Sequence, residues 1–361
     1  MIEQLLQKAV QVGRPFIEKG AVATYIPELG NADKNKLGIC VHTLDGGRFA
    51  CGDVHDRFSI QSISKVITQA AALELCGFDT VFENVGMEPS GDAFNSLIKL
   101  EISGSHPYNP MINSGAIAVA SYTQPRISFS NMLALTQQLC HDKGVVLDEK
   151  VYHSEMENVA RNRAIAYLLE SKGVIKGNVE EALDFYVRMC SLSVTAEGLA
   201  NLGLLLANDG VDPNGGGRLL ESDTVRVVKT IMLTCGMYDG SGEFAVRVGL
   251  PTKSGVGGGL LSLADGQMGI GIYGPALDIK GNSIAGEQML RFLSSQLHLH
   301  MFDSSRFAVD PKTMLEWIGT PFADYSFFKC ILCVYRYFFL CFVQFAKKTA
   351  GKVKQNTLKW Y

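Results

Sequence analysis

Segments with the pattern of β-strands lie before residue 60 and after residue 240, and a long helical stretch separates them. Residues 37–42 and 48–51 flank the turn Asp45-Gly46-Gly47 and predict a β-hairpin. Period-two alternation predicts three later antiparallel strands, over 244–250, 258–263 and 267–273. Strands at both ends that enclose helices predict an α+β fold, in which helices face one antiparallel sheet and a helical subdomain is added.

The helices are predicted from apolar residues that recur every three or four positions. Residues 3–18 have one broad apolar face, and 60–75 form a second such segment with Gly77 just beyond its end. Further helices are predicted over 129–142, 154–172, 179–191, 194–208 and 283–297.

The composition describes a globular protein with a sizeable core, since 47% of the 361 residues are hydrophobic and 19% are charged. A net charge of −3 provides no general attraction for nucleic acid, so we expect no nucleic-acid partner. The nine cysteines form no disulfide framework and the first residues are no signal peptide, which predicts reduced thiols and a cytoplasmic location. No metal site is predicted, because Cys330-x-x-Cys333 lacks a second pair.

Residues 303–361 differ chemically from the rest, with nine Lys and Arg against four Asp and Glu. Their apolar, aromatic-rich stretch 327–346 is long enough to span a bilayer, but Arg336 near its centre would be costly there. We therefore expect no membrane contact by this tail. We divide the chain into a domain over 1–302 and a basic C-terminal extension over 303–361.

The sharpest local motif is Ser62-Ile63-Ser64-Lys65, at the start of a predicted helix that directly follows the hairpin. The spacing places both side chains on one helix face, where a desolvated, neutral lysine can remove the serine proton. The motif is weak alone, since Ser96 and Lys99 have the same spacing without an evident role.

A second motif, Lys253-Ser254-Gly255, lies at the end of a late predicted strand. An early Ser-x-x-Lys and a late Lys-Ser/Thr-Gly occur in this order in serine β-lactamases and penicillin-binding proteins. The glycines over 255–259 could instead mark a phosphate loop, but the Walker spacing is missing and no helix follows promptly.

Residues 3–302 resemble one family, the bacterial-type, β-lactamase-like glutaminases. Eight stretches match in order, and together they are very specific although each is modest alone. They are 21–29 (AVATYIPEL), 58–66 (FSIQSISKV), 89–97 (PSGDAFNSL), 109–117 (NPMINSGAI), 154–155 with 161–165, 184–186, 235–238 (CGMY) and 248–259 (VGLPTKSGVGGG).

The resemblance implies that the chain hydrolyses L-glutamine to L-glutamate and ammonia without a metal or organic cofactor. It makes Ser62 the nucleophile and Lys65 its base, and it places Tyr25 close to the nucleophile. The substrate positions of the family fall on Ser62, Asn113, Glu155, Asn162, Tyr186, Tyr238 and Val256. Glu155 suits the substrate ammonium, Tyr238 could pass protons to the leaving ammonia, and the Ser62 and Val256 N–H groups could bind the oxyanion. Relatives commonly form homo-oligomers, so a dimer or tetramer is expected.

The chain departs from the family pattern at two places, and two alternatives to the glutaminase function stay open. Thr24 stands where the family usually has aspartate, and everything from Asp303 onward is unmatched. The first alternative is a penicillin-recognising serine hydrolase or peptidase, against which the missing export signal counts. The second is an inactive relative that binds glutamine, against which the intact Ser62 and Lys65 count.

Overall fold

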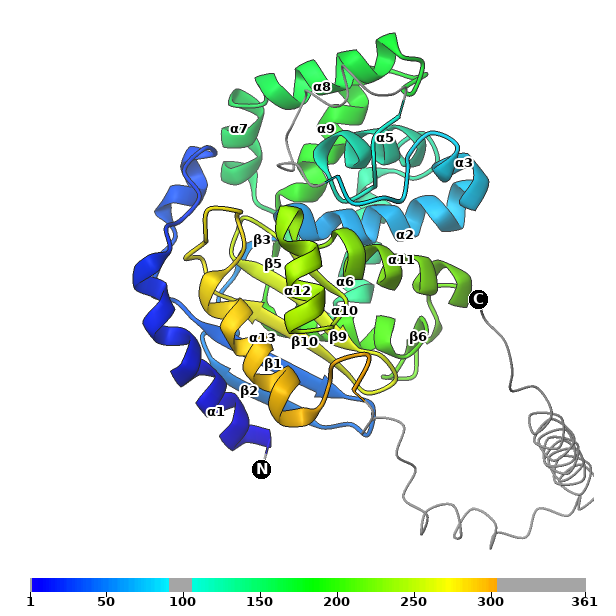
Figure 1. The fold of residues 1–361 in the computed structure, drawn as a ribbon. Helices are drawn as coiled ribbons and strands as arrows, with labels where there is room; N and C mark the ends of the chain where they lie inside the picture. Colours follow the sequence, from blue (N-terminus) through cyan, green and yellow to red (C-terminus); the bar gives the residue numbers. More distant parts are fainter. Residues whose placement is uncertain (1, 91–105, 304–361) are drawn as a thin grey trace, which may run out of the picture. The chain divides into compact units, whose positions relative to one another are not determined.

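The structure is a computed structural model that describes residues 2–90 and 106–303. Its centre is a five-stranded antiparallel sheet with the strand order β2-β1-β10-β9-β8 (Figure 1). The early hairpin lies beside a late strand, and Gly38 pairs with Tyr273 while Thr43 pairs with Met268. The strands are β1 (Gly38–Thr43), β2 (Arg48–Gly52), β8 (Thr252–Ser254), β9 (Gly259–Ala264) and β10 (Met268–Tyr273).

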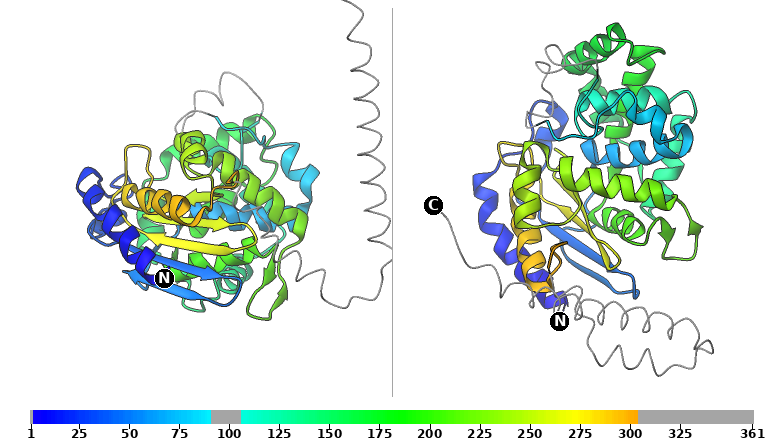
Figure 2. Two further views of the ribbon diagram at one scale, coloured as in Figure 1. Left: turned by 60° about the horizontal axis from the view of Figure 1, so that its bottom comes forward. Right: turned by 45° about the vertical axis from the view of Figure 1, so that its right-hand side comes forward.

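Helices cover both faces of this sheet, as Figures 1 and 2 show. Ile39 and Val41 point to one face and pack under α1 (Ile2–Gly13) and α13 (Ile284–Leu297), whereas Cys40 between them faces the other core. That second face is covered by α10 (Ala196–Ala207), which lies unusually close to β10. A Cβ at Gly271 would lie 1.8 Å from the Ala196 carbonyl oxygen, so only glycine allows this approach.

The remaining helices are α2 (Ser64–Cys76), α3 (Phe78–Phe82), α5 (Asn113–Thr123), α6 (Phe129–Leu139), α7 (Glu149–Glu157), α8 (Ala160–Ser171), α9 (Val179–Cys190), α11 (Ser222–Cys235) and α12 (Ser241–Arg247). They pack around the larger core except for α12, whose Phe244 packs in the core under α1 and α13. In Figure 1, α3, α5, α7, α8 and α9 form a helical half that α2 separates from the sheet. Short 3₁₀ turns are η1 (Arg14–Lys19), η2 (Pro27–Asn31), η3 (Gln61–Ile63) and η4 (Tyr238–Gly240), and β6 (Val211–Asp212) pairs with β7 (Gly217–Arg218).

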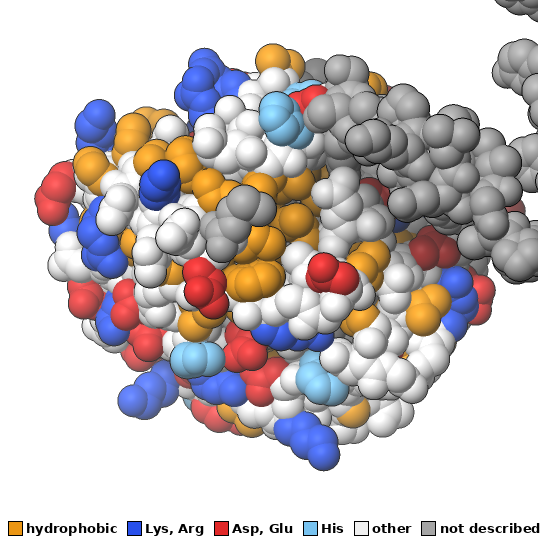
Figure 3. All heavy atoms as spheres, turned by 90° about the horizontal axis from the view of Figure 1, so that it is seen from below, with side chains coloured by type: hydrophobic (Ala, Val, Ile, Leu, Met, Phe, Trp, Pro, Cys, Tyr) orange, Lys and Arg blue, Asp and Glu red, His pale blue; other side chains and the backbone are white. Residues whose placement is uncertain are grey.

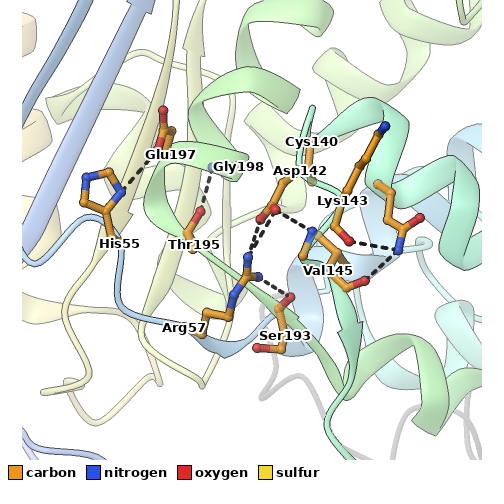
Figure 4. A network of polar contacts seen from close by, with 12 residues as sticks. His55, Arg57, Cys140, Asp142, Lys143, Val145, Ser193, Thr195, Glu197 and Gly198 are labelled. Atoms are coloured by element: carbon orange, nitrogen blue, oxygen red, sulfur yellow. Dashed lines mark hydrogen bonds and ion pairs between the residues drawn. The ribbon is translucent and has the colours of Figure 1, made fainter.

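A small three-stranded sheet, in the order β3-β5-β4, holds the segment that leads into α2. It consists of β3 (Phe58–Ser59), β4 (Val146–Leu147) and β5 (Leu192–Val194). Figure 4 shows its polar support: Arg57 donates to both carboxylate oxygens of Asp142 at 3.1 Å and to the Ser193 carbonyl at 3.3 Å. The chain just before Ser62 is thereby anchored to two other parts of the fold.

The structure confirms the α+β prediction, the early hairpin, the strands near 258–263 and 267–273, and the helix near 283–297. The predicted strand over 244–250 is wrong, because this segment is mostly helix α12. Its buried residues Ser241, Phe244 and Val248 follow a helical spacing, while Val246 is 80% exposed. The adjacent strand is instead β8, which begins just after Pro251.

Other predicted helices are shorter or divided. The helix over 154–172 is two helices, because α7 ends at Glu157 and the Asn158 side chain folds back onto the Ser154 carbonyl. The helix over 129–142 ends at Leu139, and His141 has a positive φ of 48°. Residue 194 belongs to β5, and α10 starts only after Thr195, whose hydroxyl caps the helix by accepting from Gly198 N–H.

No helix among residues 2–90 and 106–303 has both the length and the apolar character needed to cross a membrane. Basic and acidic side chains are interspersed on the face in Figure 3, with apolar side chains between them. The predictions for Ser96–Lys99 and for the tail, including Cys330, Cys333 and Arg336, lie outside the described residues.

Candidate active site

Ser62 lies in the η3 turn, directly between strand β3 and helix α2. Its side chain is buried, and the preceding residue Gln61 has a positive φ of 47° that bends the chain sharply. The glycine-rich segment after β8 packs on this turn. A Cβ at Gly257 would lie 2.2 Å from the Ser59 carbonyl oxygen, and one at Gly255 would lie 2.6 Å from that of Ile60. The glycines therefore bring Val256 up to the Ser62 turn.

Lys65, one turn after Ser62, is almost completely buried. Its Nζ donates to Asn113 Oδ1 at 2.7 Å and to the Met111 carbonyl at 3.3 Å, both at the start of α5. Asn109 fixes this start, because its side-chain oxygen accepts from the N–H groups of Met111 and Ile112. The other end of the Asn113 amide donates to Asn162 Oδ1 at 3.0 Å, so a polar chain runs from Lys65 to helix α8.

Burial lowers the pKa of Lys65 to about 8, because the charged ammonium loses its hydration. Cys190 and Glu155 counteract part of this shift by raising the pKa. The neutral state that a general base requires is therefore far more accessible near neutral pH than for an ordinary lysine.

Glu155, on helix α7, is buried next to Gln61. Gln61 Nε2 donates to its carboxylate at 3.4 Å and to the Ser59 hydroxyl at 3.0 Å. Burial raises the pKa of Glu155 to about 7, although Gln61 and Lys65 both lower it. No Lys, Arg or His in the described part of the chain forms an ion pair with Glu155. A buried carboxylate in this state is a site that a positively charged group can occupy favourably.

Tyr186, on helix α9, lies between Lys65 and Glu155. Lys65 Nζ is 5.9 Å from the centre of its ring, and burial raises the pKa of its hydroxyl well above the usual value. Glu155 and Tyr25 are close enough to raise this pKa further. The phenol is therefore neutral, and it shares a side-chain hydrogen bond with Cys190.

Tyr238, in η4, reaches the nucleophile from the sheet side. Its backbone has a positive φ of 53°, and its hydroxyl donates to the Ser254 carbonyl at 3.3 Å. Burial raises the pKa of Tyr238, while a hydrogen bond with the Ser62 hydroxyl lowers it. The ring packs with Val256 in a small apolar cluster.

Tyr25 closes the mouth of the site. Its side chain is 54% exposed and lines an open groove of about 490 Å³ together with Val256. Burial of its hydroxyl end raises the pKa of Tyr25 well above the usual value, and the nearby Tyr238 and Glu155 raise this pKa further. The groove continues along residues 19–24 and 277–281.

The structure thus brings the eight other residues predicted for the site around the buried Ser62. Asn162 and Tyr25 are the more accessible members, and the others are buried. The neighbours absent from the predicted set include Gln61, which bonds to Glu155, Lys253, which lies under Tyr238, and Cys190, which lies beside Lys65 and Tyr186. The Lys-Ser-Gly motif signalled Lys253, but no sequence feature indicated the contact of Gln61. Residues 2–90 and 106–303 contain no group of three or more His, Cys, Asp or Glu arranged to hold a metal ion.

Comparison with known proteins decides the family. The family model described as Glutaminase matches residues 20–302, which is most of the chain. The chain belongs to the glutaminase family. Curated glutaminases of Fusobacterium nucleatum and Clostridium botulinum are 52% and 50% identical to it over 305 residues, covering 83% of this chain and 100% of each relative.

Solved structures of the glutaminase family have the same fold as this chain. A probable glutaminase named YbaS matches with a TM-score of 0.78 and 39% identity, over 83% of this chain and 98% of the other. A probable glutaminase from Bacillus subtilis, complexed with 6-diazo-5-oxo-L-norleucine, matches with a TM-score of 0.75 and 38% identity, over 83% and 96%. The β-lactamase-like α+β fold predicted for this glutaminase-family chain is therefore confirmed.

Proposed function

We propose that this chain hydrolyses L-glutamine to L-glutamate and ammonia through an acyl-enzyme on Ser62. The observation that carries the proposal is the environment of Lys65. A neutral lysine has two N–H groups and one lone pair, and two acceptors, Asn113 Oδ1 and the Met111 carbonyl, face its Nζ. Both N–H groups can be satisfied there, which leaves the lone pair for the proton of Ser62.

The reaction then has two balanced steps. In the first, Ser62 Oγ attacks the side-chain carboxamide carbon, its proton passes to Lys65, and the C–N bond breaks as the nitrogen leaves as ammonia with that proton. Tyr238, hydrogen-bonded to Ser62, is the candidate that relays the proton to the leaving nitrogen. In the second step, water attacks the ester and Ser62 regains its proton, releasing glutamate.

The oxyanion of each step needs two backbone donors, and the N–H groups of Ser62 and Val256 are our candidates. The close packing of the glycine-rich segment on the Ser62 turn supports this pairing. The loss of one such donor typically raises the barrier by about 2.7–4 kcal/mol.

The α-amino-acid head of glutamine requires partners for a positive and a negative charge. We assign the ammonium to Glu155, which is buried and whose carboxylate, within residues 2–90 and 106–303, is bonded only to the Gln61 amide. Asn113, Asn162 and Tyr186 are candidates for hydrogen bonds to the head, and Tyr25 covers it from the groove. Because Glu155 is buried, its interaction with an ammonium is strong and its desolvation is already complete.

Three wider predictions belong to this proposal. We assign the catalytic domain to residues 1–302, consistent with the family match that ends at residue 302. We expect a homo-oligomer, either a dimer or a tetramer, and a cytoplasmic location. We also expect 6-diazo-5-oxo-L-norleucine, the compound bound to the Bacillus subtilis relative, to react with this chain at Ser62.

The test is release of ammonia and glutamate from L-glutamine by the purified full chain, with Ser62→Ala alongside. We expect equal amounts of the two products from the wild type and a loss on the order of 10⁶-fold in the variant, as for other serine nucleophiles. A folded wild-type protein that binds glutamine without releasing either product would instead support the inactive, glutamine-binding alternative.

A further inference from the structure

Cys190 is a buried thiol within the site, and the proposed reaction does not use it. It is the last residue of helix α9, it is 1% exposed, and the charges of Lys65 and Glu155 both act on it. Burial raises the pKa of Cys190 to about 12, so the thiol keeps its proton near neutral pH. A thiol in this state is neither a nucleophile nor a general base, and its role must lie in its contacts.

The backbone of Cys190 holds the chain just before the nucleophile. Its carbonyl accepts from the Ser59 hydroxyl at 2.9 Å, and the same Ser59 oxygen accepts from Gln61 Nε2 at 3.0 Å. Strand β3 and the η3 turn are thereby tied to the end of helix α9. This contact uses the main chain of residue 190, so it does not explain why the side chain there is a thiol.

The thiol itself has two hydrogen-bond partners. The Ser64 hydroxyl, from the Ser62–Lys65 motif, donates to Cys190 Sγ at 3.7 Å. Tyr186, one helical turn earlier on α9, shares a side-chain hydrogen bond with the same sulfur. A thiol can accept at sulfur and donate its one proton. Because Ser64 already donates to the sulfur, the S–H proton can be directed to the phenol oxygen of Tyr186.

The direction of this hydrogen bond matters for the substrate. A phenol has one proton, and if Tyr186 donated it to sulfur, none would remain for glutamine. When the thiol donates instead, the phenol oxygen acts as the acceptor and the phenol O–H stays available. The ammonium of the glutamine head is itself a donor, so the acceptor in the head for this O–H is the α-carboxylate.

We propose that Cys190 is a positioning residue for substrate recognition: its S–H group donates to the Tyr186 oxygen and so directs the phenol proton toward the carboxylate of bound glutamine. This inference rests on the proposed glutaminase activity and adds a residue to it. Because Cys190 acts through Tyr186, it affects binding of the glutamine head and leaves the chemical steps at Ser62 unchanged.

The experiment is a double-mutant cycle on the full chain, with kcat and KM for L-glutamine measured for wild type, Cys190→Ala, Tyr186→Phe and the double variant. We expect Cys190→Ala to raise KM roughly two- to tenfold, the range that one hydrogen bond contributes. The kcat should change by less than about threefold, because uniform binding alone is lost. In the Tyr186→Phe background, Cys190→Ala should have almost no further effect on KM, because both substitutions act through one hydroxyl.

Cys190→Ser separates the hydrogen bond from the packing of the side chain. A serine hydroxyl can accept from Ser64 and donate to Tyr186, as the thiol does, although it is smaller than the thiol. We therefore expect Cys190→Ser to recover most of the KM that Cys190→Ala loses. Should Cys190→Ala not fold, as judged by circular dichroism, Cys190→Val takes its place, because it fills the space without either hydrogen bond.

Cys140→Ala is the matched control. Cys140 is also a fully buried cysteine of the larger core, and burial raises its pKa to about 12 as well. Its carbonyl accepts from Asn201 Nδ2 at 3.0 Å, and neither residue belongs to the proposed site. Cys140→Ala should lower the unfolding temperature about as much as Cys190→Ala does, since each removes one buried sulfur, but its kcat and KM should equal those of the wild type.

Four results would overturn the inference while leaving the proposed function intact. They are a wild-type KM in folded Cys190→Ala, an equal rise of KM in Cys190→Ser, effects that multiply in full in the double variant, and a wild-type KM in Tyr186→Phe. A wild type without glutamine turnover would overturn the proposed function, and the Kd for L-glutamine from calorimetry would then replace KM in the same comparison. A wild type that does not bind glutamine at all would overturn both.

Discussion

The helical half and the sheet half contribute to the site in different ways. The helical half provides separate polar side chains, each from a different helix: Asn113 from α5, Glu155 from α7, Asn162 from α8 and Tyr186 from α9. The sheet half provides the rigid glycine-rich segment after β8, together with Tyr238 and the lysine beneath it. Helix α2, which carries Lys65, lies between the two (Figure 1).

We propose that this division separates recognition of the substrate from the chemical steps. The side chains of the helical half surround the space proposed for the amino-acid head, which does not change during the reaction. The groups of the sheet half surround Ser62, where the covalent bonds change. Substitutions in the helical half should therefore act mainly on kcat/KM through binding, and those near Ser62 mainly on kcat.

The largest effect after loss of the nucleophile is expected for Lys65→Met. The substitution retains the length of the buried side chain and removes its amine, so kcat should fall by about 10³–10⁴-fold, toward the upper end for general-base catalysis. Steady-state kinetics with ammonia detection measures the loss. A kcat within tenfold of the wild type would exclude Lys65 as the base. It would also contradict the proposed division between substrate recognition in the helical half and chemistry near Ser62.

A smaller effect is expected for Glu155→Gln in the helical half. The glutamine side chain preserves the shape but removes the charge that binds the substrate ammonium. Truncating one partner of a buried charge pair costs about 2–5 kcal/mol, so kcat/KM should fall by roughly 30-fold to 5,000-fold, mostly through KM. Thermal unfolding should change little, since burial alone already disfavours the charge. Unchanged kcat/KM would contradict the assignment of the ammonium to Glu155.

The pH dependence of kcat/KM should depend on both Glu155, in the helical half, and Lys65, on α2. The reactive enzyme requires Glu155 ionised and Lys65 neutral, and their pKa values of about 7 and about 8 both place that state at higher pH. As the pH falls, kcat/KM should drop about tenfold per unit below pH ~8 and more steeply below pH ~7. The two titration steps of this profile belong to Glu155 and Lys65 as a coupled pair. Glu155→Gln should remove the additional, steeper fall of kcat/KM below pH ~7. A flat profile over this range would rule out the assumed protonation states.

The smallest effect is expected outside the site, on truncation after residue 302. Residues 303–361 are basic and aromatic-rich and lie beyond the family match, so removing them should leave kcat and KM unchanged and raise solubility. Activity and soluble yield of the truncated chain are compared with those of the full chain. A truncated chain that folds normally but has lost turnover would assign a catalytic contribution to the extension.

The sequence predicted the two halves to different degrees. Local periodicity predicted the hairpin, the strands near 258–263 and 267–273 and most helices. Their periodic apolar residues are the ones buried in the two cores. The segment 244–250 failed because apolar residues at alternate positions also fit a helix when Val246 is left exposed. Local periodicity cannot distinguish the two in so short a segment.

The site was predictable from the residues alone only at Ser62 and Lys65, where three-residue spacing is enough to place two groups together. Asn113, Glu155, Asn162 and Tyr186 come from four helices that meet only through tertiary packing, so only the family resemblance suggested them. The burial of Lys253 and the contact of Gln61 with Glu155 arise from tertiary packing, and the positive φ angles of Gln61 and Tyr238 follow from no local sequence pattern.

The central claim, that Ser62 is the group acylated by a glutamine carboxamide, is tested most directly by covalent labelling. The full chain is incubated with 6-diazo-5-oxo-L-norleucine, digested, and analysed by mass spectrometry with Ser62→Ala alongside. We expect one adduct per chain on the peptide that contains Ser62, loss of glutamine turnover in parallel, and no adduct in the variant. An adduct on another residue that accompanies loss of turnover, or an adduct that persists in Ser62→Ala, would contradict it.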